Sequence, residues 1–174
     1  MKLFGNWRKQ KNTDTTETAF VPAEAAPAVV KQDSSLGQDR KILVVDDNPV
    51  VLKAFELKLK ALGFQVLIAA EGATAVSLAR QERPDLIVLD INFPPDVGSS
   101  GLQWDGFNIM QWMQRFQEVA NIPVIIITAG DPSKLKEKAI AAGAVAFFQK
   151  PINHEEFLIA VRRTLGNGAK PQAA

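Results

Sequence analysis

Short apolar runs recur along the chain, and each is followed by a stretch in which apolar residues lie three or four positions apart. The runs are Ile42 to Val45, Phe64 to Ile68, Leu86 to Leu89, Val124 to Ile127 and Val145 to Phe148. An uninterrupted run as short as Ile42 to Val45 is typical of a strand covered on both faces in a parallel sheet. We therefore predict five buried parallel strands.

The stretches after these runs are expected to form amphipathic helices, because their apolar positions repeat with a helical period. The first contains Leu52, Phe55 and Leu59 and is expected to stop at Gly63. The later helices are marked by Ala75 with Val76 and Ala79, by Ile109 with Met110, Met113 and Phe116, by the segment Pro132 to Ala142, and by Phe157 with Leu158, Val161 and Leu165. Asn153 is the expected N-cap of the last helix.

This alternation of strand and helix predicts an α/β fold. Right-handed crossovers between parallel strands give a doubly wound, flavodoxin-like sheet with strand order 2-1-3-4-5 and helices on both faces. We place this domain at residues 39–166 and expect a disordered tail or linker at residues 1–38, where Pro22 and Pro27 interrupt a polar and small-residue composition. Residues 167–174 are expected to be a short disordered tail.

Composition narrows the class of protein. With 174 residues, 47% of them hydrophobic, the chain can bury one ordinary core. The absence of cysteine excludes disulfides and thiolate metal sites, which fits a cytoplasmic protein. No apolar run approaches the roughly 20 residues of a membrane span.

Charge gives little indication of a nucleic-acid partner. The net charge of +1 provides no electrostatic basis for direct nucleic-acid binding, and we predict none. The segment Met1 to Asn12 is basic and also carries Leu3, Phe4 and Trp7. Such a segment suits a weak contact with a membrane surface or a partner protein, but a solubilising tail is the preferred interpretation, because the periodic stretch is too short to favour an isolated helix.

Polar side chains follow four of the predicted strands directly: Asp46 and Asp47, Asp90, Thr128, and Lys150. The carboxyl ends of parallel strands meet at one edge of the sheet, where ligands of α/β folds collect. Three clustered carboxylates repel one another unless a cation compensates, and hard oxygen ligands suit Mg²⁺. A lysine and a hydroxyl at the same edge suit an anionic group. The set as a whole points to phosphoryl transfer onto a carboxylate.

The segment from Arg40 to Leu165 resembles the receiver domains of two-component response regulators. The motifs that carry the resemblance are Val44-Val45-Asp46-Asp47, Pro84-Asp85-Leu86-Ile87-Val88-Leu89-Asp90, Ile127-Thr128-Ala129 and Lys150-Pro151. This resemblance implies that Asp90 is the phosphoacceptor. It also implies that Asp47 binds Mg²⁺ directly, that Asp46 binds it through water, and that Asn92 offers its backbone carbonyl.

The resemblance also implies a switch. Thr128 is similar to the hydroxyl that turns toward the phosphoryl group, and Lys150 to the lysine that contacts it. Phe147 falls where the family has its switch aromatic, and it lacks the hydroxyl of a tyrosine. The Lys150-Pro151 bond is expected to be cis, as in the family.

The function implied is that of a stand-alone receiver in a phosphorelay, which is not an enzyme beyond its own phosphorylation and dephosphorylation. The donor would be a phosphohistidine on a sensor histidine kinase or a histidine phosphotransfer protein. Because no output segment is recognisable, we expect output through binding to an unidentified protein, and a homodimer is also considered.

One segment departs from the family pattern. Asp105-Gly106 follows Asp90 about eight residues later than the usual spacing, so Pro95 to Trp104 is an insertion beside the site. It would shield the acyl phosphate, contact a partner or be a tolerated surface loop. His154, the only histidine, is expected to be an ordinary surface residue rather than a phosphodonor.

Three other functions are alternatives for this pattern. A phosphorylation-independent scaffold with a receiver fold would keep the fold and lose the chemistry. A phosphatase of the haloacid dehalogenase type also uses an aspartyl phosphate, but it needs an acid two residues after the nucleophile, where this chain has Asn92. A dinucleotide-binding domain is disfavoured because no Gly-x-Gly turn follows the first strand.

Overall fold

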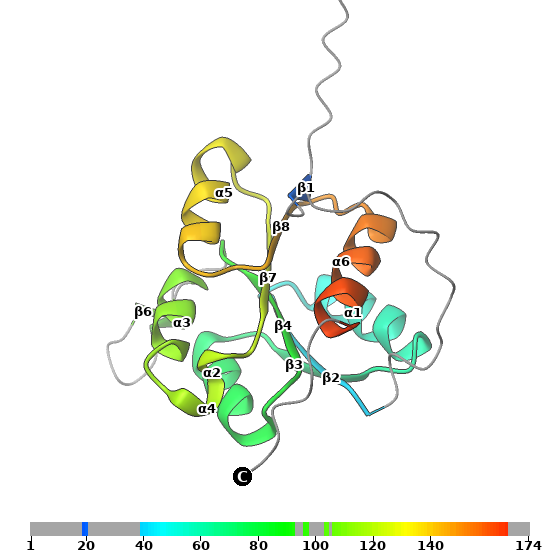
Figure 1. The fold of residues 1–174 in the computed structure, drawn as a ribbon, viewed down its shortest axis with the longest axis horizontal. Coiled ribbons are helices and arrows are strands. Elements are labelled where there is room, and N and C mark those ends of the chain that lie inside the picture. The colour runs from blue at the N-terminus through cyan, green and yellow to red at the C-terminus, as the bar shows by residue number, and fades with distance from the viewer. Residues whose placement is uncertain (1–18, 21–38, 93–95, 98–102, 105, 167–174) are drawn as a thin grey trace, which may run out of the picture.

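The computed structural model describes residues 19–20, 39–92, 96–97, 103–104 and 106–166. Its main sheet has the order β1-β8-β7-β4-β2-β3 (Figure 1). The parallel strands are β2 (Lys41–Val45), β3 (Gln65–Ala69), β4 (Leu86–Asp90), β7 (Val124–Thr128) and β8 (Ala146–Gln149). Read in chain order, these five strands are arranged 2-1-3-4-5, so the predicted fold class is confirmed.

The helices follow the strands as the periodicity predicts. They are α1 (Pro49–Ala61), α2 (Gly72–Glu82), α3 (Gly106–Met113), α4 (Gln117–Ala120), α5 (Pro132–Ala141) and α6 (His154–Gly166). Asn48 caps α1 by accepting a hydrogen bond from the Val50 amide at 2.9 Å. Asn153 does the same for α6 through the Glu155 amide at 3.1 Å, as predicted. After α1, Gly63 takes a φ of 88°, which glycine adopts without steric cost.

Alternating residues of the strands belong to two hydrophobic layers, one on each face of the sheet. On one face, Ile42 and Val44 pack with α1 and α6, while on the other Leu43 and Val45 pack with α2 and α3. Figure 1 shows α1 and α6 on one side of the sheet and the other four helices on the opposite side. Because both faces are covered, β2, β4 and β7 are buried along nearly their whole length, which explains their uninterrupted apolar sequence. The prediction of a buried strand is wrong for β3, which lies at the edge of the sheet and exposes Gln65 and Ile68.

A single helix was predicted to contain both Ile109 and Phe116, but the structure has two helices in this region. Ile109, Met110 and Met113 are buried in α3 as expected, but α3 ends at Met113. Phe116 is the extended N-cap residue of α4, and its amide donates to the Met113 carbonyl. The helical spacing therefore identified the buried face but not the break in the backbone.

Two short elements lie where no strand was expected. Strand β1 (Ala19–Phe20) pairs antiparallel with β8 and extends the sheet. The rest of the predicted tail, and residues 167–174, lie outside the described residues. In the predicted insertion loop, β5 (Asp96–Val97) and β6 (Gln103–Trp104) pair as a separate antiparallel hairpin.

Candidate functional site

The three predicted acids meet at the carboxyl ends of β2 and β4, which are neighbouring strands of the sheet. One carboxylate oxygen from each of Asp46, Asp47 and Asp90 lies within 4.8 Å of the other two. Asp46 is 0% exposed and Asp90 is 4% exposed, whereas Asp47 is on the surface. The sequence-based expectation that strand ends bring these residues together is therefore correct in geometry.

The two buried carboxylates are held in the same way. One oxygen of Asp46 accepts a hydrogen bond from the Asn48 amide at 3.0 Å, and one oxygen of Asp90 accepts from the Asn92 amide at 2.8 Å. Each acid thus closes a tight turn at the end of its own strand. The second oxygen of each acid is directed toward the same cation.

That cation is Lys150, which follows β8 and begins a cis Lys150–Pro151 bond, as predicted. Its ammonium donates to Asp46 at 2.6 Å and to Asp90 at 2.5 Å. The Lys150 backbone amide donates to the Thr128 carbonyl at 2.8 Å, which fixes the start of the lysine against β7. One lysine therefore balances part of the charge of two acids that come from different strands.

Burial and ion pairing act in opposite directions on these groups. Burial raises the pKa of Asp46 above its ordinary value, with a smaller contribution from the Asp90 charge, and the hydrogen bonds from Lys150 and Asn48 only partly oppose it. For Lys150, burial lowers the pKa, but the hydrogen bonds and charges of Asp46 and Asp90 outweigh it, so the pKa is raised. Lys150 thus offsets only part of the cost of burying the Asp46 carboxylate.

Thr128 lies at the carboxyl end of β7 and is fully buried. Its hydroxyl oxygen accepts a hydrogen bond from the Gly130 amide at 3.0 Å. A Cβ at Gly130 would lie 2.7 Å from the Asn92 side-chain nitrogen and would also collide with Leu135. Because Gly130 has no side chain, there is space for the Asn92 side chain between the carboxyl ends of β4 and β7.

Gly106 supports the acid cluster from the far end of the insertion. A Cβ on this residue would lie 2.5 Å from the Ile91 Cα and 2.8 Å from the Asp90 carbonyl oxygen. The first residue of α3 is therefore packed directly on the backbone that carries Asp90. The Asp105-Gly106 motif was recognised in the sequence, but no structural role was predicted for Gly106. A close approach between two backbone segments does not produce a periodic pattern of residues.

The other two residues singled out from the sequence occupy different environments. Phe147 is 1% exposed and belongs to the core on the α2 and α3 side of the sheet. His154 is exposed at the first residue of α6, as predicted. Partial burial, followed by the nearby Lys58 charge, lowers the His154 pKa.

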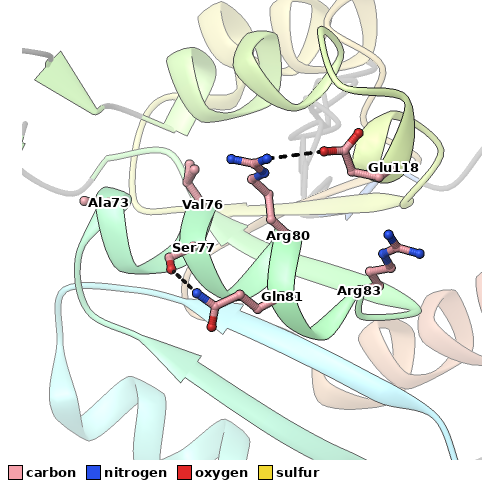
Figure 2. Close-up of a pocket in the computed structure, with 7 residues that line it drawn as sticks. All are labelled: Ala73, Val76, Ser77, Arg80, Gln81, Arg83 and Glu118. Carbon is pink, nitrogen blue, oxygen red and sulfur yellow. Dashed lines mark hydrogen bonds and ion pairs between the residues drawn. The ribbon is translucent and has the colours of Figure 1, made fainter.

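A hollow of about 460 Å³ lies between α2 and α4, away from the acids (Figure 2). Arg80 reaches across it to Glu118 at 3.6 Å and lies over the rings of Trp112 and Phe116. Ser77 and Gln81 are hydrogen-bonded to each other on the same helix. Because Arg80 and Glu118 balance each other in an open hollow, the acid cluster is the stronger candidate for chemistry.

The response regulator receiver domain model matches residues 42–162. The chain therefore belongs to the response regulator receiver family, a family of two-component signalling modules rather than catalytic enzymes. Membership implies a histidine kinase partner in general terms and disfavours the dehalogenase-type phosphatase and the dinucleotide-binding domain. Within the described ranges, no helix combines the length and apolar character needed to cross a membrane.

The chain matches one relative over nearly that protein's whole length and another over about half of its length. The polar-differentiation response regulator DivK of Brucella anthropi is 30% identical over 128 residues, which span 74% of this chain and 98% of that protein. The DNA-binding dual master transcriptional regulator RpaA of Synechocystis is 34% identical over 135 residues, or 77% of this chain and 53% of that protein. This chain thus spans about half the length of RpaA.

Solved receiver structures have the same fold. The receiver domain of sensor histidine kinase PA1611 from Pseudomonas aeruginosa is 29% identical, with a TM-score of 0.63 over 74% of this chain and 98% of that one. That structure has a magnesium ion coordinated in its active-site cleft. The Vibrio cholerae chemotaxis protein CheY4 is 26% identical, with a TM-score of 0.62 over 72% of this chain and 98% of its own.

Proposed function

We propose that this chain is a phosphoacceptor receiver in which Asp90 takes a phosphoryl group from a phosphohistidine. The observation that carries the proposal is the position of the Lys150 ammonium, which contacts both Asp46 and Asp90 within a cluster of three carboxylates. A buried acid held between a lysine and two further acids is an arrangement that suits a divalent cation and a phosphoryl group together. We also propose residues 39–166 as the unit that carries this function.

The donor set fits Mg²⁺. Three carboxylates converge with one oxygen each, and the raised pKa of Asp46 indicates that positive charge is still needed there. Asp46, Asp47 and Asp90 would hold the ion with the backbone carbonyl of Asn92, Asp46 acting through water. When bound, Mg²⁺ supplies positive charge that neutralises phosphoryl oxygens and the three acids.

The chemical step uses the Asp90 carboxylate as nucleophile. A carboxylate oxygen of Asp90 attacks the phosphorus of the phosphohistidine, the new P–O bond forms, and the P–N bond breaks with its electron pair leaving on the imidazole. The Asn92 amide holds the other Asp90 oxygen, which leaves the oxygen that now contacts Lys150 for the attack. Lys150 then contacts the phosphoryl group carried by Asp90.

Thr128 and Phe147 are the proposed switch residues. The Thr128 hydroxyl accepts from Gly130, and turning it toward a phosphoryl group on Asp90 would break that contact. Thr128 and Phe147 lie on the paired strands β7 and β8, so a change at the end of β7 would be felt by the neighbouring strand β8. Phosphorylation would then shift an equilibrium between two arrangements of this region.

The proposed donor is a sensor histidine kinase or a histidine phosphotransfer protein, and the proposed output is a changed protein surface read by a partner. Homodimerisation of the phosphorylated form is one version of that output. The chain is proposed to act in the cytoplasm without contacting nucleic acid directly.

The test is to incubate the full chain with Mg²⁺ and a small acyl phosphate and to weigh the intact protein. We expect one added phosphoryl group in the wild type and none in Asp90→Asn. Asp131→Asn is the matched control, because Asp131 is an exposed N-cap of α5 and asparagine caps equally well.

Two results would contradict the proposal. One is the absence of added mass in the wild type, and the other is an equal gain in Asp90→Asn. Either result would favour the phosphorylation-independent scaffold, which unchanged partner binding by Asp90→Asn would support further.

A further inference from the structure

The outer edge of β8 is covered by a strand from far away in the sequence. Five neighbouring strands of the main sheet are parallel, and β1 is the antiparallel addition beside β8. Ala19 lies opposite Phe148, and Phe20 lies opposite Phe147. Figure 1 shows β1 at the end of the sheet remote from β3, beside the strand that leads to α6.

The direction of the β8 amides shows which of them need this partner. The Lys150 amide, just after β8, donates to the Thr128 carbonyl at 2.8 Å, and this bond follows the register in which Thr128 lies opposite Gln149. Because successive amides of a strand point to opposite sides, Phe148 and Ala146 also face β7, while Phe147 faces the outer edge. Phe20 therefore lies opposite an outward-facing amide.

Strand β8 is a suitable platform for docking an extended segment. Phe147 and Phe148 are both 1% exposed and lie in the opposite hydrophobic layers, so the strand cannot rotate or slip without disturbing both. An unpaired edge on such a strand is a ready template for another strand. Edges of this kind are commonly covered by a further segment of chain.

The sequence around Ala19 fits the role of a short edge strand. Thr18, Phe20 and Val21 are residue types that favour extended backbone. Pro22 cannot donate to a ladder, which limits the pairing at that end. Residues 21–38 connect this strand covalently to the rest of the chain, and a covalent connection raises the effective concentration of the segment at the edge.

We propose that the outer edge of β8 is a docking edge for an extended segment, and that the chain's own Ala19–Phe20 occupies it in cis. While β1 is in place, the edge is closed to any second strand. The proposal goes beyond the phosphoacceptor function and does not depend on it. Since Phe148 lies two residues before Lys150, the docking edge and the acid cluster are built on one strand.

Hydrogen exchange of single β8 amides in the full chain tests the pairing. We expect the Phe147 amide to be protected in the wild type and to exchange about fivefold faster, or more, in Phe20→Pro, because proline removes the N–H that pairs with the Phe147 carbonyl and is not accommodated at a hydrogen-bonded position of a ladder. Phe20→Val is the matched control, since valine keeps the N–H and favours strands, and it should retain the protection.

The Phe148 amide provides an internal control, because it faces β7 and should exchange equally in all three proteins. A Phe147 amide that is unprotected in the wild type, or unchanged by Phe20→Pro, would overturn the proposal. Protection that falls on dilution would show that a second copy supplies the strand, which would overturn the assignment in cis.

A synthetic peptide of residues 15–24 tests whether the edge accepts a strand in trans. Added at about millimolar concentration, it should shift the Phe147 amide signal in Phe20→Pro and leave the wild type unchanged. Equal shifts in both proteins would contradict occupation by β1, and no shift in Phe20→Pro would contradict a docking edge.

Discussion

Lys150 donates a hydrogen bond of 2.6 Å to Asp46, a residue 104 positions earlier in the chain and fully buried. The same ammonium contacts Asp90, so the lysine connects the carboxyl ends of β2, β4 and β8. Without added cations, Lys150 is the positive charge that compensates the two buried acids. This contact is the basis of the first three predictions.

Replacing Lys150 with methionine should destabilise the protein. Removing one partner of a buried ion pair leaves its acids without compensation, a change that typically costs about 3 kcal/mol. Urea unfolding at neutral pH without divalent cations measures the effect. Lys58→Met removes an exposed lysine from α1 and should change stability by less than about 0.5 kcal/mol. Equal stability of Lys150→Met and the wild type would contradict this account.

The contribution of Lys150 should disappear at alkaline pH. Its pKa is raised above the ordinary value of 10.5, so the folded state binds this proton more tightly than the unfolded state. The stabilisation is therefore fully present below pH 10.5 and is lost as the pH rises through the folded-state pKa. Thermal unfolding of wild type and Lys150→Met across this range should show converging melting temperatures, and a constant difference would argue against the contact.

Asp46→Asn should stabilise the protein in the absence of divalent cations. Burial raises the pKa of Asp46, so folding favours its protonated form, and stability falls as the pH rises above the ordinary value of 3.8. At neutral pH we expect the variant to melt higher by about 2–4 °C. Asp47→Asn is the matched control, because Asp47 is exposed and its replacement should leave the melting temperature nearly unchanged.

Comparing Asp46→Asn with Asp47→Asn should distinguish effects on stability from effects on Mg²⁺ binding. Added Mg²⁺ should raise the melting temperature of the wild type through preferential binding to the folded state. It should do so less in either Asp46→Asn or Asp47→Asn. A lower melting temperature of Asp46→Asn without cations would contradict the assigned effect of burial.

Gly106→Ala should disturb the end of β4 that carries Asp90. The new Cβ would overlap the Ile91 backbone and the Asp90 carbonyl, and backbone atoms cannot move aside as a flexible side chain can. Overpacking of this kind costs about 1–3 kcal/mol, which urea unfolding would detect. Gly166→Ala is the control, because a Cβ there meets nothing within 4 Å. Equal effects of the two substitutions would refute the close approach.

Thr128→Val should accept the phosphoryl group but fail to transmit it. Valine keeps the buried shape of threonine and loses the oxygen that accepts from Gly130, at a cost of about 1 kcal/mol. The amide signals of Phe147 and Phe148 should shift with a stable phosphoryl analogue in the wild type and in Thr128→Ser, which keeps the hydroxyl. Shifts of the same size in Thr128→Val would show that the hydroxyl does not couple the site to β8.

The amino-acid pattern predicted the secondary structure well where the signal is local. Buried strands such as Ile42 to Val45 give short uninterrupted apolar runs, and Asn153 marks a helix start by side-chain chemistry that acts within two or three residues. The break between Met113 and Phe116 was missed, because both residues keep the helical spacing of a buried face. Strand β1 was also missed, since two residues are too short for a periodic signal.

By itself, the sequence determined the strand order and the residues at the carboxyl ends of the strands, since alternation and crossover handedness restrict an α/β chain to few arrangements. It could therefore place Asp46, Asp90 and Lys150 at one edge. Only the tertiary structure decided that Lys150 contacts both acids, that Gly106 packs on the Asp90 backbone, and that Ala19 pairs with Phe148. These contacts depend on distances between strands that are remote in the chain, and such distances are set by register and packing rather than by any local pattern of residues.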